Sequence, residues 1–268
     1  QGCRQGNIPV QNWNVSAGTD FEGMFYNCSN VASLDLSGWT PTPLYCKAMF
    51  QGARGVKSLS LAGFNMTAAI RIQDMFKQCS SLTTAGVSAW DLSLCENMVA
   101  VFEDCSVFVD DISNWNITSA LTRIDYAFYR CTNFNSNISS WDVSSVTDMR
   151  SVFASTELFN QPLNSWDTGN VTTMQNMFNS ATSFNQPIGN WDVSSVTDMR
   201  YMFPRAYAFN QPLNSWNPAN VTNMYGMFEL ANAFDQSLSN WNVEKVTDFR
   251  RFMTNILLST ANYNSTLI

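Results

Sequence analysis

The sequence has no histidine, and only 13% of its 268 residues are charged. The absence of histidine excludes catalysis that uses an imidazole as general base, and metal sites that depend on imidazole ligands. A typical soluble domain carries about 25% charged residues, so this surface must rely on neutral amides and hydroxyls.

Long apolar runs and clusters of basic residues are missing too. No stretch approaches the roughly 18 apolar residues that a transmembrane helix needs, and no amphipathic basic helix is visible. The 14 Lys and Arg residues face 21 Asp and Glu residues, which gives a net charge of −7. The sequence therefore predicts neither membrane insertion nor nucleic-acid binding. Because the first residue is Gln1 rather than Met, we interpret the chain as a processed product or an excised fragment.

What the sequence does contain is a repeat. The decapeptide WDVSSVTDMR occurs at 141–150 and again at 191–200. Tryptophan recurs about every 25 residues, with Phe64 in one of its places: Trp13, Trp39, Trp90, Trp115, Trp141, Trp166, Trp191, Trp216 and Trp241. A period of this length indicates about ten stacked coils in one domain, 1–268. We expect divergent, Cys-containing repeats at 1–140, regular repeats at 141–253, and a C-terminal cap or the start of a continuation at 254–268.

Apolar residues hold fixed places in each repeat. In one repeat these are Leu163 before Trp166, and Val171, Met174 and Phe178 after it. Columns of this kind at a constant period are expected to form the core of the stack.

The same columns suggest secondary structure. Short apolar stretches around each Trp predict strands, whereas V-T-x-M-x-x-M-F has the apolar spacing of three and four that is typical of a helix. A Thr precedes each of these segments as a candidate helix cap: Thr147, Thr172, Thr197, Thr222 and Thr247. We therefore predict an α/β solenoid with a parallel β-sheet on one face and short helices on the other, its strands stacked about 4.8 Å apart.

Two groups of sequence motifs in the chain resemble those of a known family. The segments 25–31, 76–82 and 102–105 resemble the F-x-x-C-x-x-L word of the BspA-like, treponemal type of leucine-rich repeat. The words FNQPI at 184–188, WDV at 191–193 and MF at 202–203 are similar to the F-N-Q-P-L-x-x-W-D-V-S-x-V-T-x-M-x-x-M-F variant, a BspA-like surface-protein domain of unknown function.

This resemblance covers essentially the whole chain. It implies a right-handed, leucine-rich-repeat-like solenoid of about ten 25-residue coils on a secreted or surface protein, of a kind often called an adhesin. The resemblance implies no catalytic residues in this sequence. The chain departs from the pattern at Phe64, at Pro41 and Pro218, and in the irregular repeat lengths before residue 141. We expect these departures to bend the array or to form its N-terminal cap.

Seven cysteines are present, which is an odd number. Five of them fall in or near one column of the repeat: Cys3, Cys28, Cys79, Cys105 and Cys131. One interpretation is a column of buried thiols that pack as small apolar groups. The other is a disulfide between adjacent coils, joining Cys105 to Cys131 or Cys79 to Cys105. Because the chain has neither histidine nor a CxxC motif, we expect no zinc site.

Eight N-x-S/T sequons begin at Asn14, Asn27, Asn65, Asn116, Asn137, Asn170, Asn220 and Asn264. Several would carry glycan if the protein is secreted by a eukaryotic cell or encoded by a virus of eukaryotes. In a bacterial protein they would have little meaning.

Polar residues also recur in columns. Asn160, Asn185, Asn210 and Asp235 each follow a Phe, and this spacing predicts a ladder of side chains that satisfy the backbone of the turns. Calcium is an alternative, supported by three carboxylates that follow Trp: Asp142, Asp167 and Asp192. No dense calcium loop accompanies them. Ice binding by the Thr column is a further alternative, which helix capping would make unnecessary.

The residues just before each Trp are small and polar. We interpret them as a binding face made of Asn164, Ser165, Gly189, Asn190, Asn214, Ser215, Ser239 and Asn240. This surface lacks the aromatic and Arg anchors of tight protein interfaces. We therefore expect weak, multivalent binding to a glycan, to a protein on another surface, or to copies of the chain.

Two functions remain open. The first is a secreted or cell-surface module for adhesion or recognition, neither an enzyme nor a holder of cofactors. The second is a structural subunit or spacer of an extracellular filament, sheath or virion surface. Unpaired edges at the ends of the stack would favour the second function, and polar caps at both ends would favour the first.

Overall fold

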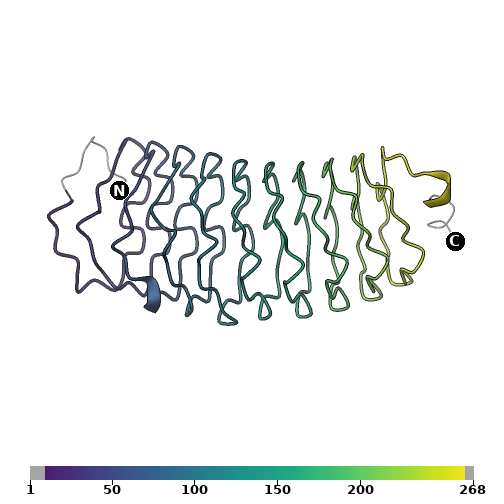
Figure 1. Cartoon of the computed structure of the whole chain (residues 1–268), viewed down its shortest axis with the longest axis horizontal. Coiled ribbons are helices and arrows are strands. Elements are labelled where there is room, and N and C mark those ends of the chain that lie inside the picture. The colour runs from purple at the N-terminus through teal and green to yellow at the C-terminus, as the bar shows by residue number, and fades with distance from the viewer. Residues whose placement is uncertain (1–9, 263–268) are drawn as a thin grey trace.

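The chain forms an elongated stack of coils, as the computed structural model of residues 10–262 shows (Figure 1). Successive coils follow one another along the long axis, and one continuous apolar core runs through them from Val10 to Leu238. The repeat inferred from the Trp spacing is therefore confirmed as a structural unit, because each period corresponds to one turn of the stack.

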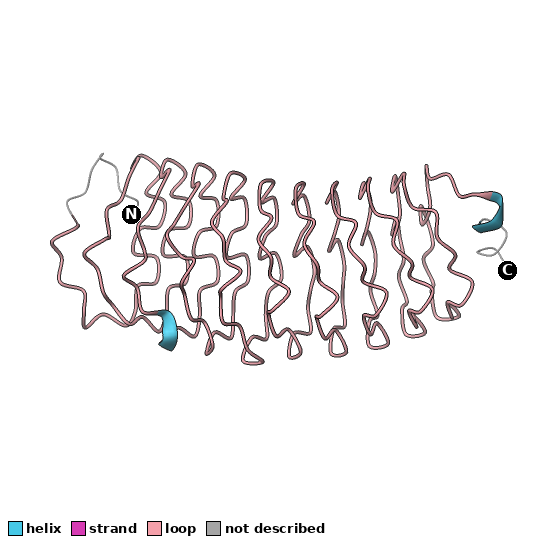
Figure 2. Cartoon of the chain, in the orientation of Figure 1, coloured by secondary structure: helices cyan, strands magenta, loops and turns pink. Residues whose placement is uncertain are grey.

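The predicted α/β solenoid is wrong. In residues 10–262, the helical segments are the 3-10 helix η1 (Met66–Ala68) and one turn at 260–262 (Figure 2). Strand pairing in this part of the chain is limited to isolated parallel bridges between coils, such as Asp148 with Thr173 and Thr173 with Asp198. Neither the parallel β-sheet on one face nor the row of short helices on the other is present.

The segments predicted to be helical are turns that pair with the next coil. The N–H groups of Met149, Ser151 and Phe153 donate to carbonyls 24 residues ahead, at N···O distances of 3.0, 2.9 and 3.0 Å. Within the same segment, the N–H of Ala154 donates to the carbonyl of Ser151, three residues back, at 3.3 Å. An α-helix would instead direct each N–H to the carbonyl four residues back. We call this segment of each coil the turn ladder.

Left-handed backbone conformations also exclude a helix here. Ser151 has φ 55° and Ser155 has φ 57°, and Asn176 and Ser180 repeat this spacing of four residues in the next coil. Residues in this conformation occur singly in turns, since a left-handed helix costs about 1–2 kcal/mol per residue. The apolar spacing of three and four thus arises from consecutive turns, which periodicity by itself does not separate from a helix.

The Thr column does not cap helices. Thr172 donates from both its backbone N–H and its Oγ1 to the carbonyl of Thr147, at 2.8 and 3.0 Å. Thr197, Thr222 and Thr247 repeat both bonds along the stack. These residues therefore connect neighbouring coils, and the predicted capping role is wrong.

The predicted strands before each Trp are also turns. The N–H of Trp166 donates to the carbonyl of Leu163 at 3.1 Å, which places Asn164 and Ser165 at the centre of a β-turn. Trp191 makes the same bond to Ile188. The small polar residues of the predicted binding face therefore lie at the tips of turns.

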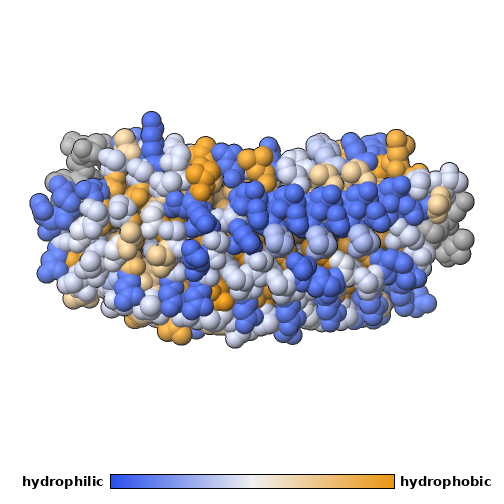
Figure 3. All heavy atoms as spheres, in the orientation of Figure 1, coloured by the Kyte–Doolittle hydropathy of each residue, from blue (hydrophilic) through white to orange (hydrophobic). Residues whose placement is uncertain are grey.

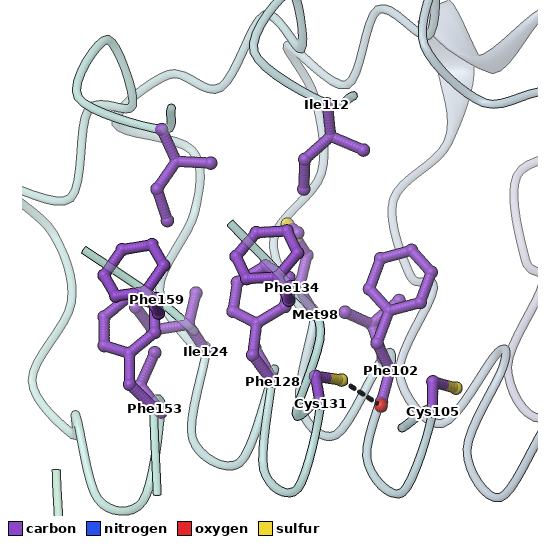
Figure 4. Close-up of a cluster of buried hydrophobic side chains, with 14 of the residues drawn as sticks. Met98, Phe102, Cys105, Ile112, Ile124, Phe128, Cys131, Phe134, Phe153 and Phe159 are labelled. Carbon is purple, nitrogen blue, oxygen red and sulfur yellow. Dashed lines mark hydrogen bonds between the residues drawn. The ribbon is translucent and has the colours of Figure 1, made fainter. Parts of the chain in front are cut away.

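Stacked aromatic rings fill the core. Phe153 stacks on Phe178 of the next coil at a centroid distance of 5.6 Å. It also stacks on Phe159 of its own coil at 4.2 Å, as Figure 4 shows. Trp166 and Trp191 form a third column, 6.4 Å apart. Stacked ring pairs of this kind stabilise the fold beyond the contribution of the apolar area that each ring buries. Trp191 is only 3% exposed, so its assignment to the core is confirmed.

Most Trp indoles also hydrogen-bond between coils. The Nε1 of Trp191 donates to the carbonyl of Leu163 at 2.9 Å, and that of Trp216 donates to Ile188 at 3.0 Å. Trp141 is buried to the same extent as Trp191, but its Nε1 has no partner within the described residues. The two copies of one decapeptide thus differ in the hydrogen bond of the buried indole.

Candidate functional site

The predicted binding face is accessible, but its polar groups help to join the coils. Asn190 donates to the carbonyl of Asn164, and Ser215 donates to the carbonyl of Gly189. Asn214 accepts from the N–H of Asn240 at 3.0 Å. Gly189 and Asn214 are half-buried, and the other members of this face are exposed, including Ser239 and Ser165, whose Oγ donates to the carbonyl of Ser139. Part of the hydrogen-bonding capacity of this face therefore serves the scaffold.

The predicted amide ladder is confirmed. The Oδ1 of Asn185 accepts from the N–H of Asn210 at 2.9 Å and from Nε2 of Gln211 at 3.0 Å. The Oδ1 of Asn160 and of Asn210 each accept the same pair of bonds one coil away. At the last step Asp235 uses its carboxylate oxygen in the same way.

The glycosylation sequons are at the surface. Asn264 lies outside the described residues, and the other seven asparagines are all exposed: Asn14, Asn27, Asn65, Asn116, Asn137, Asn170 and Asn220. In three of them Nδ2, the atom that a glycan would occupy, donates a hydrogen bond to the preceding coil: Asn116, Asn170 and Asn220. A glycan on these three would replace an inter-coil contact, so the other four are the better acceptors.

The cysteine column consists mostly of buried thiols. Cys79, Cys105 and Cys131 are free and fully buried, and their Sγ atoms donate to Phe carbonyls of the preceding coil at 3.1, 2.9 and 2.8 Å. Figure 4 shows the bond from Cys131 to the carbonyl of Phe102. The predicted disulfides among these three are therefore wrong, and the buried-thiol interpretation is confirmed for them. Cys28 is disulfide-bonded, and Cys3 lies outside the described residues.

Burial makes these thiols unreactive. Desolvation raises the pKa of Cys131 far above its ordinary value, and it raises the pKa of Cys46 and of Cys95 to about 12. Since the thiolate is the nucleophilic form, none of these groups is a reactive cysteine at neutral pH.

The carboxylates after Trp do not converge. Asp142 and Asp192 each accept from a Ser two residues ahead, and the Ser hydroxyl in each case lowers the pKa of the carboxyl group. Across residues 10–262, no group of three or more Cys, Asp or Glu side chains is placed to hold a metal ion. The same part of the chain contains no helix with the length and apolarity to cross a bilayer.

The sequence reasoning did not identify the side of the stack that carries most of the cations. The turn ladders, with the residues directly after them, occupy 45–54, 71–80, 97–106, 123–132, 148–157, 173–182, 198–207, 223–232 and 248–257. We call this continuous surface the turn-ladder strip. It holds eleven of the fourteen Lys and Arg residues, namely Lys47, Arg54, Arg71, Lys77, Arg123, Arg130, Arg150, Arg200, Arg205, Arg250 and Arg251. The fifty-residue recurrence of Arg150, Arg200 and Arg250 was the available signal.

One groove on this strip combines several cations. It has a volume of about 390 Å³, and its lining includes Arg200, Arg205, Arg251, Tyr201 and Glu229. Arg200 is paired with Asp198 at 2.7 Å, and Arg251 is paired with the nearly buried Glu229. Hydrophilic side chains form rows along the long axis on the face shown in Figure 3, so the polar surface repeats with the coils.

The repeats also identify the family. The family model described as "Mycoplasma protein of unknown function, DUF285" matches residues 1–84, 44–164, 118–194 and 159–266. Its overlapping matches span nearly the whole chain. The chain belongs to this family. As a DUF285 protein it is a member of a repeat family whose description assigns no activity, and no curated protein matches it.

Proposed function

We propose that this DUF285 protein is a non-catalytic module for adhesion or recognition, displayed outside the cell. The observation that carries the proposal is the regular display of polar groups along the stack. Arg150, Arg200 and Arg250 each pair with an Asp of their own coil and recur every second coil on the turn-ladder strip. A surface with repeated groups binds a repetitive partner with an avidity well above the affinity of each contact.

The distribution of titratable groups supports a function without catalysis. Ion pairs between Asp or Glu and Lys or Arg recur along the strip in the described part of the chain, such as Lys77 with Glu103 at 3.0 Å. An active site would instead bring a base and a second reactive group together in one cleft. The BspA-like words of the sequence, typical of secreted surface proteins, also support the proposal.

Binding to displayed glycans tests this function. The purified protein is applied to glycans immobilised at low and at high density. We expect weak binding at low density and much stronger binding at high density, because several coils then engage at once. The absence of binding to any glycan at either density would contradict recognition of this class of ligand.

A structural subunit is the second candidate, and the ends of the described stack favour it. In the last full coil, the N–H groups of Phe249 and Arg251 have no partner within residues 10–262, and neither do the carbonyls of Asp20 and Glu22 in the first coil. Donors thus face one end and acceptors face the other, at equivalent places of the turn ladder. Unpaired edges of this kind are templates for further pairing.

Charged side chains at the two ends of the stack occupy matching positions in the same register. Glu22 pairs with Lys47 of the next coil at 3.2 Å, and Arg250 holds in the last coil the place that Lys47 holds in the second. A second copy stacked on the last coil would therefore bring its Glu22 next to Arg250. A head-to-tail contact of this kind repeats without closing and builds a filament.

Electron microscopy of the protein from its native source separates the two candidates. Regular filaments would favour a structural subunit, whereas isolated arcs would favour recognition. With the purified protein, light scattering should show concentration-dependent assembly that Glu22→Lys or Arg250→Glu prevents. An equimolar mixture of the two variants should restore assembly, because alternating copies then meet an opposite charge at both ends. A protein that remains monomeric at every concentration would contradict the structural candidate.

A further inference from the structure

The groove on the turn-ladder strip has the chemistry of an anion site. We propose that it binds a carboxylate or sulfate group of an acidic polysaccharide, with Arg205 as the principal contact. This inference rests on the proposed recognition function and specifies the class of its ligand.

The three arginines of the groove are not equivalent. Arg200 is held by Asp198, and Arg251 is held by Glu229, whose side chain is only 8% exposed. Arg205 is exposed, and its guanidinium forms no hydrogen bond or ion pair in the described part of the chain. Its planar set of donors matches a carboxylate or a sulfate group. Because Arg200 and Arg251 keep their carboxylate partners, Arg205 supplies the unpaired positive charge of the groove.

Neutral groups complete the groove. Asn179 donates to Oδ1 of Asn176 at 3.1 Å, and both side chains line the groove beside Arg205. Amides in this position suit sugar hydroxyls, which both donate and accept hydrogen bonds. A saccharide that carries an anionic group fits this combination better than an inorganic anion does.

A pair of tyrosines lies next to the arginines of the groove. Gly226 leaves room for the ring of Tyr201, since a Cβ at this position would lie 2.7 Å from Cε1 of that ring. Tyr201 packs edge-on against Tyr225 at 4.9 Å. Hydrogen bonds from Tyr201 and then from Arg251 lower the pKa of the Tyr225 hydroxyl, and the hydrogen bond to Tyr225 raises the pKa of the Tyr201 hydroxyl.

The same column of the repeat offers a matched control. Arg130 lies three coils before Arg205, and both residues have left-handed backbones, with φ 59° and φ 57°. Unlike Arg205, Arg130 is paired with Asp104 at 3.4 Å and lies 4.7 Å from the centre of the Tyr129 ring. Replacing either arginine with glycine removes one charge and suits the left-handed backbone, so both variants are expected to fold.

The experiment measures the binding of three polymers: heparin, which is sulfated, polygalacturonate, which is carboxylated, and dextran, which is neutral. We expect the unmodified protein to bind at least one anionic polymer, more weakly as salt rises, and to bind dextran much less. Arg205→Gly should weaken binding on the order of tenfold, in line with the loss of one charged hydrogen-bonding group, whereas Arg130→Gly should leave it nearly unchanged.

The outcomes separate this inference from the function on which it rests. Equal losses in Arg205→Gly and Arg130→Gly would overturn the groove as the site, and so would dextran binding as tight as anionic binding. In either case recognition of polysaccharide would stand. If the protein binds only neutral glycans of the immobilised set, the anion site is overturned but the recognition function stands. Binding to none of the polymers and to no displayed glycan would overturn both proposals.

Discussion

At the scale of single residues, the two copies of WDVSSVTDMR provide a matched comparison. Trp141 and Trp191 are equally buried, but only Trp191 donates an indole hydrogen bond, to the carbonyl of Leu163. Trp191→Phe removes this bond and leaves the carbonyl with the N–H of Trp166 as its remaining partner, whereas Trp141→Phe removes a donor that was already unsatisfied. We therefore expect Trp191→Phe to cost about 1–2 kcal/mol more in the free energy of unfolding.

Denaturant unfolding of both variants measures this difference. As a reference for the size of the core contribution, Trp191→Ala should cost about 3–5 kcal/mol, because it removes a large buried ring. Equal losses in the two Phe variants would show that the Leu163 hydrogen bond does not contribute to stability.

The free thiols allow a second test at this scale. Within residues 10–262 five cysteines are free, and all of them are buried: Cys46, Cys79, Cys95, Cys105 and Cys131. Because burial makes them inaccessible, we expect no reaction of these five with a thiol reagent at neutral pH until the protein is unfolded. Mass spectrometry of labelled peptides identifies which thiols react. Rapid labelling of Cys105 in the folded protein would contradict its place in the core.

At the scale of the structural element, the amide ladder is the feature most open to a substitution test. Asn185→Ala removes an oxygen that accepts two hydrogen bonds from the next coil, from the N–H of Asn210 and from Gln211. We expect it to lower the free energy of unfolding by about 1–3 kcal/mol, since the N–H of Asn210 loses its protein partner and Gln211 keeps only its bond to the carbonyl of Asn185.

Asn185→Asp is the control for this substitution, because it keeps the accepting oxygen. Asp235 performs this role naturally, with its Oδ1 accepting from Ser259 and Asn262. The Asp variant should therefore be clearly more stable than the Ala variant in thermal and denaturant unfolding. If both lose the same stability, the ladder acts through packing instead of hydrogen bonding.

At the scale of the whole molecule, the fold predicts an unusual spectrum for a protein with a large core. Helix in residues 10–262 is confined to η1 and one terminal turn, and strand pairing is limited to isolated bridges. Far-ultraviolet circular dichroism should accordingly lack the helical double minimum. The near-ultraviolet signal should be strong, because Trp and Phe rings are fixed in stacks. A strongly helical spectrum would contradict the turn ladders.

The sequence by itself determined the repeat, the columns of the core and the amide ladder. Residues that recur at a constant period, such as Trp166 and Trp191 or Asn160 and Asn185, must occupy equivalent places in successive coils. Burial of the aromatic columns and hydrogen bonding of the polar column follow from this equivalence. For Cys79, Cys105 and Cys131 the sequence left two interpretations open, buried free thiols and disulfides between coils.

Only the tertiary structure decided the backbone of each coil and the position of the groove. A spacing of three and four is common to helices and to consecutive turns, and they differ in where each N–H finds its carbonyl. For Met149 that carbonyl belongs to Thr173, in the next coil, and a local pattern contains no information about such a partner. The groove likewise depends on residues of neighbouring coils, Asn176, Arg205 and Arg251 among them, which approach one another only when the coils stack.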